Sequence, residues 1–224
     1  MAKHSLARAL KTEHLRAALG AAIIATALGT ATVPAYANPG STAQETQQTR
    51  QNRPDDANKI NVTASQVLEL ARQQVGTSEN ARGGGTKFQQ WYAQSPRAME
   101  TVRRDGGNPS AYLNAAWCAM FVSWVGEQTG ARPQVGWDAY TVTHAKWFSD
   151  NGRWGTVPKP GAVVFFAWNG SKSINAIQHV GFVVKDNRDG TISTIEGNTG
   201  NGAVEERVRP KSQVVGYGYP EYAA

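Results

Sequence analysis

The spacing of apolar residues changes near residue 160 of this 224-residue chain, and that change constrains the fold more than any other feature. Before it, apolar residues recur at three- and four-residue intervals, which is typical of amphipathic helices. After it, short runs rich in Val, Ile, Phe and Tyr alternate with turn residues, which is typical of antiparallel strands. Helices followed by strands predict an α+β fold, in which N-terminal helices pack against an antiparallel sheet.

One predicted helix differs from the others because it is apolar on nearly all sides. It lies between Asn114 and Gly130 and contains the run AAWCAMFVSWV. A helix of this kind is buried at the centre of a domain. With Asn114 as its N-cap and Gly130 as its stop, the helix would hold Cys118 in its first turn.

The remaining elements are predicted from caps, periodicity and turn residues. Thr63 and Gln66 fit a capping box at the start of the first helix, and Gly76 is its predicted stop. Two more helices are expected around residues 88–92 and at residues 139–149. Five strands are expected to form a meander in chain order, at residues 162–168, 179–184, 191–196, 204–209 and 214–219.

The N-terminus has the pattern of a secretion signal over residues 1–37. A start with four basic residues precedes the apolar residues 17–33, and Ala35-Tyr36-Ala37 is a small-residue cleavage site. Cleavage there would make Asn38 the new N-terminus. The alternative is an uncleaved membrane anchor, although the apolar stretch is shorter than the ~20 residues that span a bilayer.

Residues 38–60 are polar and are predicted to form a flexible linker, so the folded domain is expected at residues 61–224. Cleavage would leave 19 basic and 16 acidic residues, a net charge of +3. That charge is too small to indicate a nucleic-acid partner. No stable membrane insertion is expected after cleavage.

The chain has a single cysteine, Cys118, which excludes an intramolecular disulfide. In an exported protein such a cysteine is paired with another chain, buried and inert, or reactive. The start of a helix and a neighbouring imidazole both favour the thiolate, which is the nucleophilic form. Free backbone N–H groups at a helix start can also hold an oxyanion. A buried core cysteine remains the alternative.

Two histidines remain after cleavage, and His179 is better placed to act as a base. It opens a predicted strand, and Gly181 on the same face would leave room for a ligand. Glu196 ends the following strand and can reach the imidazole if the two strands pair, and Asn198 could do so through its amide oxygen. The alternatives are that His179 is an ordinary surface histidine, Glu196 a strand-end charge and Asn198 a turn residue.

His144 lies on a predicted amphipathic helix, so we expect it to be structural or to line a substrate groove. A metal site of Cys118, His144 and His179 is an alternative. However, these residues lack a compact ligand spacing, and no carboxylate cluster supports the site. We therefore expect neither metal nor cofactor.

Three motifs in this order, WCAMFVSWV, HVGFVV and TIEGNTG, resemble the CHAP domain, a cysteine- and histidine-dependent amidohydrolase/peptidase module. The resemblance covers about residues 63–220 and implies a papain-like fold close to the NlpC/P60 wall hydrolases. It implies that Cys118 is the nucleophile, His179 the base and Glu196 the residue that orients it. It also implies that Asn198 completes the polar site.

The resemblance further implies hydrolysis of peptidoglycan amide bonds, either between sugar and stem peptide, as in an N-acetylmuramoyl-L-alanine amidase, or within the peptide, as in an endopeptidase. The chain departs from a common family form at Ala162 in KPGAVVFF, where an acidic residue often stands. We expect that position to be structural. The expected protein is thus a secreted, wall-associated monomer whose partner is peptidoglycan. The alternatives are an inactive wall-binding module and a secreted peptidase or toxin directed at proteins.

Overall fold

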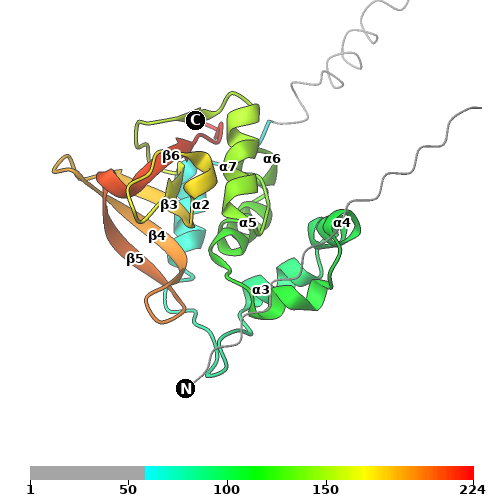
Figure 1. The fold of residues 1–224 in the computed structure, drawn as a ribbon. Helices are drawn as coiled ribbons and strands as arrows, with labels where there is room; N and C mark the ends of the chain where they lie inside the picture. Colours follow the sequence, from blue (N-terminus) through cyan, green and yellow to red (C-terminus); the bar gives the residue numbers. More distant parts are fainter. Residues whose placement is uncertain (1–58) are drawn as a thin grey trace, which may run out of the picture. The chain divides into compact units, whose positions relative to one another are not determined.

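The computed structural model describes residues 59–224, so the predicted signal at 1–37 and nearly all of the predicted linker at 38–60 lie outside the described residues. Within residues 59–224, helices come first and a six-stranded antiparallel sheet follows, which confirms the α+β prediction (Figure 1). The elements are, in chain order, α2 (Ala64–Arg72), α3 (Lys87–Ala93), α4 (Pro96–Asp105), η1 (Pro109–Asn114), α5 (Cys118–Thr129), α6 (Arg132–Val135), α7 (Thr141–Asp150), β1 (Trp154–Gly155), β2 (Val163–Phe166), η2 (Ile174–Ala176), β3 (His179–Asp186), β4 (Thr191–Thr199), β5 (Ala203–Pro210), η3 (Lys211–Gln213) and β6 (Val214–Gly218).

The predicted capping box at the start of α2 is confirmed. The Thr63 side chain accepts from the backbone N–H of Gln66, and the Gln66 side chain accepts from the backbone N–H of Thr63. These bonds satisfy N–H groups that a helix start leaves without intrahelical partners. The helix ends at Arg72, earlier than predicted, and Gly76 instead ends the turn that follows, with a φ of 91°.

The predicted start of the central helix at Asn114 is wrong. Residues from Pro109 to Asn114 form the separate 3-10 helix η1, which is capped by Asn108. The central helix α5 begins only at Cys118 and ends at Thr129, and its C-cap is Gly130, whose φ of 77° confirms it as the predicted stop. Asn108 is followed by proline, a favoured first helical residue, so Asn108 becomes the N-cap of η1. Asn114 is then the last residue of η1 and not the N-cap of the central helix.

Helix α4 was not predicted, because its sequence buries little apolar surface. Ala98 and Thr101 are its buried residues. Its start nevertheless carries a local signal, since the Ser95 side chain accepts from the Ala98 backbone N–H and Pro96 occupies the first turn. A cap followed by proline can therefore mark a helix whose apolar periodicity is weak.

The predicted meander is wrong at its last strand. The strand order is β1-β6-β2-β3-β4-β5, so β6 returns to pair with β2 instead of β5. All four residues of β2 are buried, and a buried strand needs hydrogen-bonding partners on both edges. By contrast, β5 buries only Val204, which suits an outer strand of the sheet.

The two faces of the sheet have different coverings. One face packs on the helices, and α5 contacts both β3 and β4 there. Val180 and Phe182 of β3 belong to this helix-side core. The opposite face holds a smaller cluster that includes Phe166 and Val183. Alternation along β3 therefore assigns His179 and Gly181 to this second face, at the end of the strand nearest the start of α5.

Among residues 59–224, no helix combines the length and the apolar character that crossing a bilayer requires.

Candidate active site

Cys118 is the first residue of α5 and is almost completely buried, with 5% of its surface exposed. The N-cap residue, Trp117, provides no side-chain hydrogen bond to the helix start. Its indole instead stacks on Phe88, with ring centroids 5.3 Å apart, and donates from Nε1 to Glu79 over 2.9 Å. The first turn of α5 thus lacks a side-chain cap and offers backbone N–H groups beside the thiol.

His179 lies at the start of β3 and interacts with both Cys118 and Glu196. Its Nε2 donates to Oε2 of Glu196 over 2.8 Å. His179 also interacts with the Cys118 thiol, and this interaction contributes to its raised pKa. The structure thus brings three of the predicted site residues into one chain of contacts, although they lie 61 and 17 positions apart in sequence.

Glu196 lies on β4 and is completely buried. Its Oε1 accepts from the Thr194 hydroxyl over 2.5 Å, and both its oxygens accept from Arg209. The expectation that Gly181 leaves room for a ligand is wrong. A Cβ at Gly181 would lie 2.6 Å from Cγ of Glu196, so the missing side chain makes room for the glutamate.

His179 and Glu196 each favour the charged form of the other. Burial alone would lower the pKa of His179, but hydrogen bonds to Cys118 and Glu196 raise it to about 9. Burial alone would raise the pKa of Glu196, but hydrogen bonds from His179 and Arg209 lower it to about 2. At neutral pH, the pair is therefore an imidazolium and a carboxylate.

Two residues around this pair were missed at the sequence level. Arg209 on β5 donates to both oxygens of Glu196. Trp168, just after β2, lies against the imidazole of His179, with ring centroids 5.3 Å apart. The alternation along β5 places Arg209 on the same face as Glu205, which pairs with Glu196 in the sheet, but nothing local identifies its partner.

A cavity of about 480 Å³ opens beside the thiol. Its lining includes Cys118, Gln178, Tyr140 and Arg104. Tyr140 is 52% exposed, and its ring packs against Tyr112 with centroids 6.4 Å apart. Another cavity, of about 770 Å³, lies along α2 and includes none of the four predicted site residues. Of these two cavities, the one beside Cys118 is placed to admit a carbonyl group to the thiol.

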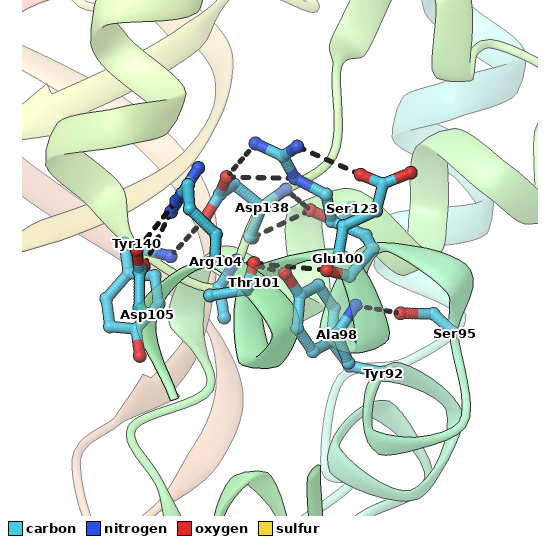
Figure 2. Close-up of polar contacts among 12 residues, drawn as sticks. Tyr92, Ser95, Ala98, Glu100, Thr101, Arg104, Asp105, Ser123, Asp138 and Tyr140 are labelled. Atoms are coloured by element: carbon cyan, nitrogen blue, oxygen red, sulfur yellow. Dashed lines mark hydrogen bonds and ion pairs between the residues drawn. The ribbon is translucent and has the colours of Figure 1, made fainter. Parts of the chain in front are cut away.

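The wall of this cavity that contains Tyr140 is fixed by the buried residue Asp138 (Figure 2). Arg97 donates to its Oδ2 from Nη2 over 2.8 Å, and the Tyr140 backbone N–H donates to Oδ1 over 2.8 Å. The Ser123 hydroxyl donates to the Asp138 carbonyl and accepts from its N–H. Because Ser123 lies on α5, these bonds tie the cavity wall to the helix that begins with Cys118.

Asn198 is placed differently from the other three predicted residues. Its φ is 55°, in the left-handed region that favours Gly and Asn. Within the described part of the chain, no hydrogen bond joins its side chain to His179 or Glu196. Asn198 follows Gly197, where a Cβ would lie 2.6 Å from Cβ of Phe121 on α5. A catalytic role for Asn198 stays a prediction from the family resemblance.

His144 is part of the core, as one of its two expected roles requires. It is 1% exposed, its Nε2 donates to the Val135 carbonyl over 2.7 Å, and its ring stacks on Phe148. Burial lowers its pKa, so the imidazole is neutral. It also lines a cavity of about 270 Å³, separate in its lining from the cavity beside Cys118 except for Thr143.

The alternative metal site is not assembled in residues 59–224. There, no group of three or more His, Cys, Asp and Glu residues is placed to hold a metal ion. Ala162, where the family form often has an acidic residue, is buried in the cluster on the second face of the sheet. The position therefore serves packing, as expected.

The family model of the CHAP domain matches residues 107–198, which contain all four predicted site residues. A search of curated proteins found no match. CHAP domains are hydrolases of the amidase and peptidase type. The segment that carries Cys118, His179 and Glu196 is therefore similar to the CHAP domain family.

Proposed function

We propose that this protein is a secreted cysteine-dependent hydrolase that cleaves amide bonds of bacterial peptidoglycan. One observation carries the proposal: a buried imidazole lies between a thiol at a helix start and a buried carboxylate. This is the arrangement that nucleophilic acyl transfer by cysteine requires. The CHAP match over the same residues supports the reaction class.

In the first half of the proposed reaction, Cys118 acts as a thiolate paired with the His179 imidazolium. The thiolate attacks the amide carbonyl, and a carbon–sulfur bond forms as the carbonyl becomes an oxyanion. Backbone N–H groups in the uncapped first turn of α5 stabilise this oxyanion. His179 gives its proton to the nitrogen, and the amine leaves as the carbon–nitrogen bond breaks.

In the second half, the remaining acyl group is a thioester on Cys118. His179, now neutral, takes a proton from water, and the resulting hydroxide attacks the thioester carbonyl. The carbon–sulfur bond breaks and releases a carboxylic acid, which loses its proton to solvent; the thiolate and the imidazolium are thereby restored. Glu196 stays ionised throughout, because its pKa of about 2 is far below neutral pH.

The proposed substrate class is tested with purified sacculi. Sacculi digested by the wild type and by Cys118→Ala would be compared by mass spectrometry. We expect fragments with new amino and carboxyl ends from the wild type alone, and their masses distinguish the amidase bond from the endopeptidase bonds. Binding without cleavage would favour the wall-binding module. Cleavage of proteins but not of sacculi would favour the protein-directed peptidase.

Export is part of the same proposal, because peptidoglycan lies outside the cytoplasmic membrane. It is supported by the basic start, the apolar stretch and the Ala35-Tyr36-Ala37 site in residues 1–37, which lie outside the described residues. N-terminal sequencing of protein from culture supernatant should begin at Asn38. Recovery only from membranes, with the first residues intact, would contradict cleavage.

A further inference from the structure

The Glu196 carboxylate is held by more donors than His179 alone. Arg209 donates from Nε to Oε1 and Oε2 over 3.0 and 3.1 Å, and from Nη2 to Oε2 over 2.6 Å. The Arg209 side chain is 16% exposed, whereas that of Glu196 is completely buried. This forked contact fixes the plane of the carboxylate, and the planar guanidinium is suited to that geometry.

Arg209 makes two further contacts that fix its own position. Its Nη2 donates to the Thr199 hydroxyl over 3.0 Å. Its guanidinium carbon lies 5.1 Å from the ring centroid of Trp168, within the range of a cation–π contact. Trp168 also packs on the His179 imidazole. Arg209 therefore contacts two groups that in turn contact His179, the Glu196 carboxylate and the Trp168 indole.

The charges in this region alternate in sign. In the active form, the order is Cys118 thiolate, His179 imidazolium, Glu196 carboxylate and Arg209 guanidinium. Without its terminal cation, the buried carboxylate would have His179 as its only charged partner, and burial of a weakly paired charge is costly. Two other charged groups on this face of β5, Glu205 and Arg207, pair with each other over 2.9 Å.

We propose that Arg209 is a positioning residue of the catalytic site, which keeps Glu196 ionised and directed at His179 and holds Trp168 against the imidazole. The inference rests on the proposed function, because it assigns Cys118 and His179 their catalytic roles. It adds to the Cys118, His179, Glu196 and Asn198 set a residue that contacts neither the thiol nor the imidazole.

The test compares Arg209→Met, Arg209→Lys and the wild type, with Arg207→Met as the matched control. Arg207 lies two residues away on the same face of β5, and its Met variant removes the same charge from a partly exposed pair. Turnover of sacculi is measured from acid to alkaline pH. In parallel, the rate of alkylation of Cys118 by iodoacetamide reports its thiolate fraction without any substrate.

We expect Arg209→Met to lower kcat by about 10-fold to 100-fold with little change in KM, as loss of an orienting partner does. The acidic side of its pH profile should shift to higher pH by at least about one unit, both for turnover and for alkylation, because Glu196 binds a proton more readily without the guanidinium. Arg209→Lys should recover part of the rate, since it keeps the charge but not the fork. Arg207→Met should match the wild type.

A double variant separates positioning from general damage to the fold. In a Glu196→Gln background, Arg209→Met should lower activity much less than in the wild type, because the carboxylate charge that Arg209 binds is already absent. Melting temperatures identify any variant that fails to fold, and Arg209→Lys then carries the comparison.

Two results would overturn the proposal: no shift on the acidic side of the pH profile of Arg209→Met, or equal effects of Arg209→Met and Arg207→Met. The substrate assignment fails separately. Intact sacculi combined with a shifted alkylation profile would contradict the proposed function while supporting the role of Arg209.

Discussion

Cγ of Glu196 occupies the space that a side chain on Gly181 would need, at 2.6 Å from the position of its Cβ. The two residues lie on the paired strands β3 and β4, where Phe182 is the partner of Ile195. Gly181 thus lets the glutamate extend across its neighbouring strand towards His179. The glycine is required by close approach alone, because its φ is not positive.

Gly181→Ala should therefore displace Glu196 and lower kcat by about 10-fold or more, while the protein still folds. The matched control is Gly216→Ala on β6, where a Cβ would meet the Trp154 side chain at 2.3 Å instead of Glu196. Kinetics and melting temperature are measured for both variants. Equal losses of turnover would show that the effect comes from general crowding of the sheet.

Cys118→Ser and Cys118→Ala should each lose turnover by roughly 1,000-fold or more, because a serine hydroxyl stays protonated where a thiol ionises. Iodoacetamide should inactivate the wild type with one carbamidomethyl group per chain, since Cys118 is the only cysteine. Intact mass and residual activity are measured on the same samples. Full activity of Cys118→Ala would contradict the mechanism.

The two histidines in the described residues should respond differently to substitution. His179→Ala should abolish turnover, because it removes the partner of both Cys118 and Glu196. His144→Ala should lower the free energy of unfolding by about 2 kcal/mol or more, because it leaves a cavity beside Phe148. Denaturant unfolding and kinetics check both. Loss of turnover in His144→Ala but not in His179→Ala would show that His144, and not His179, is the base.

The pH dependence follows from the shifted pKa values of the pair. The pKa of His179 is raised to about 9, so its stabilising contribution is complete below pH ~6.5 and is lost as the pH rises through about 9. The pKa of Glu196 is lowered to about 2, so its contribution is complete above pH ~4.5 and is lost as the pH falls through about 2.

Turnover should accordingly fall above about pH 9, when His179 loses the proton that the leaving amine needs. The free energy of unfolding should decline over the same range, and the decline should be smaller in His179→Gln, which has no proton to lose. Both are measured by titration at constant ionic strength. An alkaline limb near neutral pH would contradict the ion pair.

Asn198 offers a test that separates backbone from side chain. Asn198→Gly should fold normally, because glycine readily adopts the φ of 55°. Any loss of kcat in this variant therefore measures the amide group, and the family resemblance predicts a loss of several-fold. Asn198→Ala should also lose about 1 kcal/mol of stability through backbone strain. Unchanged kcat in Asn198→Gly would leave Asn198 a role in the turn alone.

The sequence by itself determined the features that depend on contacts within a few residues. The capping box at Thr63, the stop at Gly130 and the position of Cys118 in a first turn are local. So is the alternation that separates His179 from Val180. Each of these features rests on hydrogen bonds or side-chain directions set by neighbours in the chain, so spacing is enough to predict them.

Only the tertiary structure decided the contacts that depend on strand order and register. Pairing of β6 with β2, the clamp of Arg209 on Glu196 and the approach of Glu196 to Gly181 join residues that are distant in the sequence. A shift of one residue in the register would turn Glu196 to the opposite face of the sheet. Cys118 and His179, the proposed nucleophile and base, could thus be named from residue type and order, whereas the groups that hold them in place required the assembled sheet.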